Sequence, residues 1–286
     1  MGAPDLTLLD WAGERGRDLP WRTTRDPWAV LVCEVMAQQT QVARVVERWA
    51  PFLERFPTPA ACAAAPVADV LRLWSGLGYN RRALALHACA VAVVERHGGE
   101  MPRGLDELLA LPGIGPYTAR AVSAFAYELP HGVVDTNSAR VLARWEGRRL
   151  SARDAQAAAD AAVPEGRAWA WNQAMLDLGA TVCTRRAPRC DECPVRSRCT
   201  WFAAGCPDPD PADGSAGVSG GQSRFHGSDR QGRGRLVEAL REGPVAVAGV
   251  ADAMGWPEDP VRADRVAATL VVDGLAVRER GRYRLP

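Results

Sequence analysis

The chain has 286 residues, of which 47 % are apolar and 24 % are charged, and its formal net charge is +1. This composition is typical of a globular protein with one large or two modest hydrophobic cores. No stretch reaches the roughly 18 uninterrupted apolar residues of a membrane span, and the N-terminus lacks the basic and apolar regions of a secretion signal. We therefore expect a cytoplasmic protein without a membrane partner. All 35 Lys and Arg positions hold arginine, which excludes mechanisms that need a lysine Schiff base.

Residues 1–206 carry apolar side chains at the three- and four-residue spacing of helices, and continuous strand alternation is absent from them. Prolines and glycines interrupt this spacing and divide it into predicted helices. These helices cover residues 27–56, 67–74, 81–96, 105–111, 116–127, 136–145, 153–163 and 168–179. The pattern predicts one all-α domain over residues 1–206.

The rest of the chain divides into a linker and a small module. Pro, Asp, Gly and Ser dominate residues 207–223, which have almost nothing to bury, so we predict a flexible linker over residues 207–232. Helical spacing then returns in three short segments, and two alternating runs around a Gly-containing turn end the chain. The three predicted helices are 233–241, 246–254 and 260–273. Three helices and a hairpin predict a winged-helix-like module over residues 233–286.

Four of the eight cysteines form a tight cluster with the spacing Cys183-x6-Cys190-x2-Cys193-x5-Cys199. Without a secretion signal, such a cluster indicates metal binding rather than disulfides. The spacing is compatible with zinc and with a [4Fe–4S] cluster. The loop also carries Arg185, Arg186, Arg189, Arg196 and Arg198. These arginines either offset the thiolate charge and contact a phosphate backbone, or form an ordinary solvated face.

A Gly-rich turn lies in the segment 111–119, LPGIGPYTA, between two predicted helices. Gly113 and Gly115 permit positive φ and the close approach of another backbone. Exposed amide N–H groups at the start of the following helix could bind a phosphate without a charged side chain. Many helical hairpins contain glycine, so the turn alone is not specific.

Two acidic residues lie in apolar surroundings. Glu34 is flanked by Val32, Val35 and Met36 on a predicted helix, and burial of its carboxylate costs several kcal/mol unless it is paired or protonated. A raised pKa would suit a general acid. Asp135 follows two valines and precedes a helix, a position that also suits a plain N-cap.

The order of these features resembles the helix–hairpin–helix DNA glycosylase superfamily with an iron–sulfur loop. Closer motifs are similar to adenine DNA glycosylases of the MutY type, and the resemblance covers about residues 5–202. The motifs are LPWR (19–22), EVMAQQTQV (34–42), LWSGLGY (73–79), LPGIGPYTARAV (111–122), VDTNSARVLAR (134–144) and NQAMLDLGATVCTRRAPRCDECPVRSRC (172–199). The resemblance favours a [4Fe–4S] cluster over zinc.

The resemblance implies roles for individual residues. Glu34 and Asp135 match the catalytic glutamate and aspartate, and Asn137 matches a pocket asparagine. Tyr117 stands where relatives with lyase activity, such as endonuclease III, carry lysine, which implies a monofunctional glycosylase. Residues matched to DNA or base contacts are Arg22, Gln39, Tyr79, Gly113, Gly115 and Gln173, and the matched [4Fe–4S] ligands are Cys183, Cys190, Cys193 and Cys199.

The implied reaction is hydrolysis of the N-glycosidic bond of a flipped-out adenine. Glu34 would protonate adenine N7 and later activate water, while Asp135 would stabilise the oxocarbenium-like sugar, as the second carboxylate does in retaining glycosidases. The implied partner is double-stranded DNA that contains A·8-oxoguanine or A·G mispairs. We expect a bacterial, nucleoid-associated monomer that acts in base excision repair.

Two other functions fit parts of the sequence. A thymine (T·G) mismatch glycosylase shares the glutamate, the hairpin tyrosine and the aspartate, but the run Gln38–Thr40 favours adenine. A non-enzymatic iron–sulfur regulator that binds DNA through the winged helix would not need both carboxylates. An assay of base release from defined mispairs would distinguish them, since the two glycosylases release different bases and a regulator releases none.

The C-terminal region is where the chain departs from the family pattern. Many adenine glycosylases carry a Nudix-like domain that checks for 8-oxoguanine, and we expect none here, since residues 207–286 contain no Glu-rich Nudix box. The segment 224–228, RFHGS, could replace it by contacting the opposite strand. The terminal hairpin, with Arg278, Arg280, Arg282 and Arg284, could instead lie along a groove, or serve only for packing.

Overall fold

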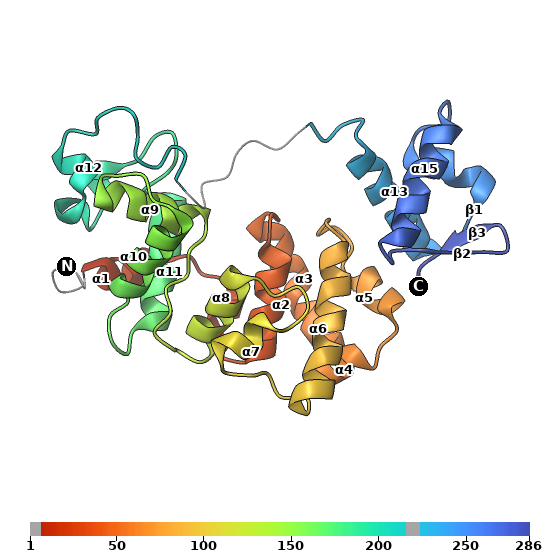
Figure 1. Cartoon of the computed structure of the whole chain (residues 1–286), viewed down its shortest axis with the longest axis horizontal. Helices are drawn as coiled ribbons and strands as arrows, with labels where there is room; N and C mark the ends of the chain where they lie inside the picture. Colours follow the sequence, from red (N-terminus) through yellow and green to blue (C-terminus); the bar gives the residue numbers. More distant parts are fainter. Residues whose placement is uncertain (1–6, 216–223) are drawn as a thin grey trace. The chain divides into compact units, whose positions relative to one another are not determined.

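The computed structural model describes residues 7–215 and 224–286 (Figure 1). Its contacts divide the chain into two compact units. The first unit comprises Met1–Val30, Arg103–Leu105 and Gly115–Gly221, and the second comprises Leu31–Pro102, Asp106–Ile114 and Gln222–Pro286. Each unit therefore combines segments that lie far apart in the sequence, unlike the consecutive domains that composition predicts.

The first unit is a group of helices around α9 and α11. Its elements are α1 (Thr7–Arg15), η1 (Pro20–Thr23), the start of α2 (Pro27–Ala37), α8 (Pro116–Ala126), α9 (Thr136–Glu146), α10 (Ala152–Ala162), α11 (Ala168–Thr181), η2 (Cys190–Glu192), η3 (Arg196–Arg198) and α12 (Thr200–Ala203). Helices α1, α8 and α9 all contact α11. Leu8, Val141, Trp171 and Leu178 are buried in the shared core, so α11 is covered by apolar side chains from several helices.

The second unit begins with the remainder of α2 and continues through five more helices. These are α3 (Val42–Arg55), α4 (Pro59–Ala63), α5 (Val67–Leu73), α6 (Arg81–His97) and α7 (Leu105–Leu109). Helix α6 contacts α4 and α5. Phe52 lies edge-on to both Phe56 and Trp74, with ring centroids 5.1 and 6.1 Å apart, and all three side chains are fully buried. Edge-to-face aromatic packing of this kind adds to the area term of core stability.

The C-terminal residues of the second unit form three helices and a small sheet. The elements are α13 (Asp229–Glu242), β1 (Val245–Ala246), η4 (Val247–Gly249), α14 (Val250–Met254), α15 (Pro260–Val272), β2 (Val277–Glu279) and β3 (Arg282–Arg284). The strands are antiparallel in the order β1-β3-β2. Tyr283 of the central strand is fully buried and pairs with Val245 and Arg278. This arrangement has the form of a winged-helix-like module.

The all-α fold is confirmed, and the local differences have identifiable causes. The predicted run 27–56 is two helices, because residues 38–41 form a turn in which Gln39 has a φ of +55°. Helix α13 begins at Asp229, inside the predicted linker, because the Ser228 hydroxyl accepts a hydrogen bond from the Gln231 amide as an N-cap. The two-residue strand β1 is too short to leave a pattern in the sequence.

The predicted linker is also ordered at its start. Ala212 is 3 % exposed and belongs to the core of the first unit, and Ser215 is buried as well. Residues 216–223 of the predicted linker lie outside the described residues. Among the described helices, none combines the length and hydrophobicity that crossing a bilayer requires.

Candidate functional site

Glu34 lies on helix α2, whose residues 28–36 are all buried and, apart from Glu34, apolar. Leu31, Val32 and Met36 are fully buried, and the glutamate itself is only 9 % exposed. Burial and, to a lesser extent, the Glu34 carboxylate raise the pKa of the neighbouring Cys33 thiol well above its usual range. The low polarity around Glu34 is the environment that favours the protonated form of a carboxyl group.

Arg82 of α6 closes the C-terminal end of this helix. Its Nη1 donates to the carbonyl oxygens of Val35 and Met36 at 2.6 and 2.8 Å, and its Nη2 donates to Thr40 Oγ1 at 2.9 Å. These carbonyls belong to the last turn of α2, where the helix has no internal donor left for them. Burial lowers the pKa of Arg82 to about 10. This value is still well above neutral pH, so the guanidinium remains charged. The sequence gives no signal for this role, since arginine occupies every basic position.

Two of the residues matched to DNA or base contacts, Gln39 and Tyr79, lie in turns that Arg82 contacts. Gln39 follows α2, and Tyr79 follows a turn whose Leu77 and Gly78 carbonyls each accept a hydrogen bond from Arg82 Nη2 at 3.1 Å. Gln39 and Tyr79 are exposed and have φ angles of +55° and +47°. A left-handed conformation costs non-glycine residues of order 1 kcal/mol and often marks a functional position.

Asp135 is the N-cap of α9, so the structural reading of this residue is confirmed. Its Oδ1 accepts hydrogen bonds from the amides of Asn137 and Ser138 at 2.8 and 2.7 Å and from Ser138 Oγ at 3.1 Å. Its Oδ2 accepts one from Asn137 Nδ2 at 3.0 Å. The carboxylate is therefore held in one orientation at the positive end of a helix. Its N-cap role and a role in stabilising a cationic intermediate are compatible.

The loop that leads into Asp135 is fixed by two side chains that the sequence does not single out. Asn172 of α11 accepts from the Val133 amide and donates to the His131 carbonyl. Asp160 of α10 accepts from the Gly132 amide at 2.8 Å. A buried backbone without partners would cost free energy, so these contacts set the path of the chain up to Asp135.

Arg140 joins the start of α9 to the cysteine loop. Its Nη2 donates to Asn137 Oδ1 at 3.0 Å, and its Nε donates to the Cys183 carbonyl at 2.7 Å. Helix α11 passes close to this point at Gly179, where an added Cβ would lie 2.7 Å from Asn137 Cβ. Asp135, Asn137, Arg140 and Cys183 thus form one chain of contacts within the first unit.

Arg22 is bound to a buried carboxylate. Its Nη1 and Nη2 lie 2.7 Å from the two oxygens of Asp177, which is 1 % exposed, and Arg17 Nε lies 2.6 Å from Oδ1. Although burial acts in the opposite direction, hydrogen bonds from Arg22 and Arg17 lower the pKa of Asp177. Gln173, which is also matched to a DNA or base contact, is half-buried on α11. The structure thus gives Arg22 a structural partner that the sequence did not predict.

The Gly-rich turn has the backbone that its glycines suggest. Gly113 has a φ of +74°, and an added Cβ there would lie 2.6 Å from the Cβ of Ala85. Gly115 is the N-cap of α8, Pro116 is its first residue, and Tyr117 is half-buried. Glycine as the N-cap has no side chain of its own to bind the first amides of α8, a feature that phosphate-binding helix starts share.

The four clustered cysteines line one cavity in the first unit, which is partly open to solvent. Burial, followed by neighbouring thiols, raises the pKa of Cys190 and Cys193 to about 11. Cys206 lies beside Cys190 as well, which the spacing of the cluster does not predict. Among the described residues, no three His, Cys, Asp or Glu side chains converge as ligands of a single metal ion. Four thiols around one cavity are a donor set that could hold either a zinc ion or a [4Fe–4S] cluster.

The arginines of the cysteine loop are on the surface. Arg185, Arg186, Arg189, Arg196 and Arg198 are all exposed. Arg189 and Arg196 form ion pairs with Glu192 and Asp191 at 3.1 and 3.5 Å. The loop therefore presents positive charge to solvent, partly offset by its own acids.

The structure places Glu34 in the second unit and Asp135 in the first, and each is positioned by contacts within its own unit. Gln39, Tyr79 and Gly113 belong with Glu34. The other predicted residues belong with Asp135, namely Arg22, Gly115, Tyr117, Asn137, Gln173 and the four cysteines.

Comparison with known proteins gives consistent matches. Residues 32–164 match the model of the HhH-GPD superfamily base excision DNA repair proteins. The chain is 43 % identical to the adenine DNA glycosylase of Mycolicibacterium smegmatis over 291 residues, which covers 100 % of this chain and 97 % of that protein. The likeness therefore includes the C-terminal module as well as the helices that carry Glu34 and Asp135.

Solved structures match about two thirds of the chain. A thermostable thymine-DNA glycosylase superposes with a TM-score of 0.66 at 29 % identity, covering 69 % of this chain and 94 % of that one. A non-covalent endonuclease III–DNA complex gives a TM-score of 0.60 at 25 % identity, with coverage of 69 % and 94 %.

Proposed function

Since the chain belongs to the HhH-GPD superfamily of base excision DNA repair proteins, we propose that it is a monofunctional adenine DNA glycosylase. Its substrate would be adenine mispaired with 8-oxoguanine or guanine in double-stranded DNA. The observation that carries this proposal is Glu34, a carboxyl group 9 % exposed on a helix of buried apolar residues. Apolar surroundings favour the protonated form of a carboxyl group, and a general acid must be protonated before it reacts.

Glu34 would act first, as the acid that protonates N7 of the flipped adenine. Protonation converts the base into a neutral leaving group, so the N-glycosidic bond breaks as positive charge develops on the sugar. In the second half of the reaction the Glu34 carboxylate would accept a proton from the attacking water. One residue thus serves as acid and then as base, which is the role of the acid/base carboxyl group in retaining glycosidases.

Asp135 would stabilise the oxocarbenium-like sugar. Among the described residues, its Oδ1 accepts three hydrogen bonds, while Oδ2 accepts one, from Asn137. The less engaged Oδ2 is the oxygen we assign to the developing cation. A carboxylate fixed before the reaction needs no reorganisation as the charge forms, which is how preorganised electrostatics lowers a barrier.

DNA binding would use backbone and side chains from both units. Gln39 and Tyr79 would enter the opened duplex, where stacking on an aromatic ring offsets part of the cost of unstacking a base. The turn at Gly113 and Gly115 would bind phosphate through amide groups. We propose that the protein acts on chromosomal DNA, as a monomer at the bacterial nucleoid.

The cysteine cavity would hold a [4Fe–4S] cluster through Cys183, Cys190, Cys193 and Cys199. Four thiols around a cavity that is otherwise lined largely by apolar side chains fit such a group. When bound, the cluster supplies four iron–thiolate bonds that cross-link residues 183–199. The exposed arginines of the loop would then be held in one arrangement for contact with phosphates.

The test is base release from a panel of duplexes with A·8-oxoguanine, A·G and T·G mispairs. We expect adenine release from the first two and none of thymine; release of thymine instead would favour the T·G function. Glu34→Gln should abolish adenine release while leaving duplex affinity unchanged, and Glu54→Gln, an exposed glutamate on α3, is the control. Retained single-turnover excision in Glu34→Gln would contradict the role of Glu34.

A further inference from the structure

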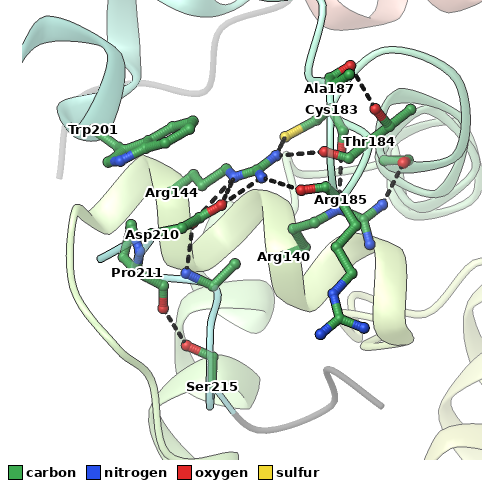
Figure 2. A network of polar contacts seen from close by, with 12 residues as sticks. Arg140, Arg144, Cys183, Thr184, Arg185, Ala187, Trp201, Asp210, Pro211 and Ser215 are labelled. Carbon is green, nitrogen blue, oxygen red and sulfur yellow. Dashed lines mark hydrogen bonds and ion pairs between the residues drawn. The ribbon is translucent and has the colours of Figure 1, made fainter. Parts of the chain in front are cut away.

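Arg144 of α9 is a buried arginine whose guanidinium contacts the cysteine cavity. Its side chain is 2 % exposed. Nη1 donates to Cys183 Sγ at 3.2 Å and to the Thr184 carbonyl at 2.9 Å, and Nη2 donates to the Arg185 carbonyl at 3.1 Å (Figure 2). The ring of Trp201 lies 4.7 Å from the guanidinium carbon. A buried cation of this kind needs a counter-charge.

The counter-charge comes from Asp210, in the segment predicted to be a linker. Asp210 Oδ2 lies 2.6 Å from Arg144 Nη2, and both carboxylate oxygens also accept from Arg144 Nε at 3.2 and 3.1 Å (Figure 2). The carboxylate in turn accepts from the Ala212 amide at 2.9 Å, which fixes its orientation. The pair therefore has the two-point geometry that makes arginine–carboxylate contacts strong.

The residues around Asp210 are fastened to the first unit at both ends, and we call residues 207–215 the strap. At its start, Trp201 Nε1 donates to the Pro207 carbonyl at 2.9 Å. At its end, Ser215 Oγ accepts from the Leu150 amide at 3.1 Å and donates to the Pro211 carbonyl at 2.7 Å. A mobile linker would not bury Ala212 and Ser215, so the strap has a structural function.

We propose that the strap retains the iron–sulfur cluster, with Asp210 as the positioning residue that holds Arg144 against Cys183 Sγ. This inference rests on the cofactor assigned under the proposed function. An N–H···S hydrogen bond disperses charge from a thiolate ligand, and such partners of the ligands tune both the affinity and the redox potential of a metal site. Without Asp210, the guanidinium would have no carboxylate counter-ion, and the strap would no longer be tied to the cavity wall.

The alternative is that Arg144 is held by the thiolates alone. The negative charge of four cluster-bound thiolates would then suffice as its counter-charge, and Asp210 would be dispensable. The two possibilities predict different behaviour when the Asp210 charge is removed and Arg144 is kept.

The experiment compares Asp210→Asn with the wild type as full-length, cluster-loaded protein. The readout is the rate at which the visible iron–thiolate absorption disappears in the presence of an iron chelator and air as the oxidant. We expect roughly tenfold faster loss, the scale typical for partners of metal ligands. The control is Asp213→Asn, the same charge change at an exposed residue of the same strap, which should lose its cluster at the wild-type rate.

A second variant covers the case in which Asp210→Asn does not fold. Ser215→Ala removes the far anchor of the strap without touching the cavity, and it should also speed cluster loss. Wild-type rates in both variants would overturn the proposal. Wild-type protein that contains no iron or sulfide when purified would overturn the cofactor assignment and the strap's role together, whereas a failure to release adenine would count only against the proposed reaction.

Discussion

The Nη1 atom of Arg82 lies 2.6 Å from the carbonyl oxygen of Val35, the residue that follows Glu34. The same guanidinium also contacts Met36, Thr40, Leu77 and Gly78. One side chain of α6 therefore fixes the end of the helix that carries the proposed acid and the two turns that carry Gln39 and Tyr79. The position of the acid and of the proposed DNA-contacting residues depends on a residue that has no chemical role itself.

Replacement of Arg82 by methionine should destabilise the protein. The carbonyls it serves would be without a donor in a half-buried site, and we expect a decrease of about 3 kcal/mol in the free energy of unfolding. Urea denaturation measures this. The matched control is Arg81→Met, because the Arg81 side chain is 74 % exposed and its ion pair with Asp273 is loose, at 3.7 Å. This substitution should lower the free energy of unfolding by less than about 0.5 kcal/mol. Equal effects of the two substitutions would contradict the role of Arg82.

Most helices could be predicted because the spacing of apolar residues and the prolines and glycines that end a helix are local features of the sequence. Helices α5, α6, α8, α9, α10 and α11 begin and end within two residues of their predicted bounds. The turn at Gln39 was missed because the sequence there has no glycine or proline, and the strained φ is maintained by contacts from a distant helix. The start of α13 was missed because the Ser228 cap lies in a stretch whose composition indicates a linker.

The supporting residues of the candidate site could not be predicted from this sequence without the family resemblance. Arg82, Arg140 and Arg144 look like any other of the 35 arginines, and their importance comes from burial at contacts between segments far apart in the chain. The role of Asp210 could not be predicted either, since an acidic residue between prolines ordinarily indicates solvent exposure. Glu34 was visible because a single charge in an apolar helix is a local anomaly.

Asp177 should make folding stability depend on pH. Its pKa is lowered in the folded state by Arg22 and Arg17, so its contribution is present above the unfolded value of about 4 and is lost as the pH falls through the lower folded value. Asp177→Asn should lower the free energy of unfolding by about 3 kcal/mol at neutral pH, because Arg17 and Arg22 are left without their buried partner. Unfolding measured between neutral and acidic pH should show the difference from wild type shrinking toward low pH.

The control for that measurement is Asp18→Asn, an exposed aspartate next to Arg17 in the sequence. It should follow the wild-type curve within about 0.5 kcal/mol at every pH. A difference between Asp177→Asn and wild type that did not narrow on acidification would show that the ion pair does not titrate as proposed.

Gly179→Ala should lower the rate of adenine release through Asn137. The new Cβ would lie 2.7 Å from the Asn137 Cβ and backbone oxygen, so the start of α9, with Asp135, must move. Misplacement of a reacting group by about 1 Å can cost of order a hundredfold in rate. Single-turnover excision at saturating enzyme measures the effect without a contribution from product release.

Gly13→Ala is the control, because no atom lies within 4 Å of an added Cβ there and the glycine belongs to a helix of the same unit. It should release adenine at the wild-type rate and be slightly more stable, since alanine favours helix. An unchanged rate in Gly179→Ala would mean that Asp135 does not depend on the contact between α9 and α11.

Two arginines of the terminal hairpin should contribute to DNA binding. Arg284 pairs with Glu279 at 3.1 Å, and Arg278 lies 3.9 Å from Asp264, whereas Arg280 and Arg282 have no ion pair among the described residues. A positive charge without an internal partner is the one that gains from a phosphate, because counterions leave the DNA when it binds.

The double variant Arg280→Gln/Arg282→Gln should therefore weaken binding to A·8-oxoguanine and A·G duplexes by the same factor. The slope of log affinity against log salt should fall by about 2 in magnitude, one for each phosphate that the protein no longer neutralises. The matched control removes two charges that are already paired within the module, Arg265→Gln/Arg284→Gln, and should change the slope less. Loss of affinity confined to the 8-oxoguanine duplex would instead assign the hairpin to recognition of the opposite base, and an unchanged slope would leave it a packing element.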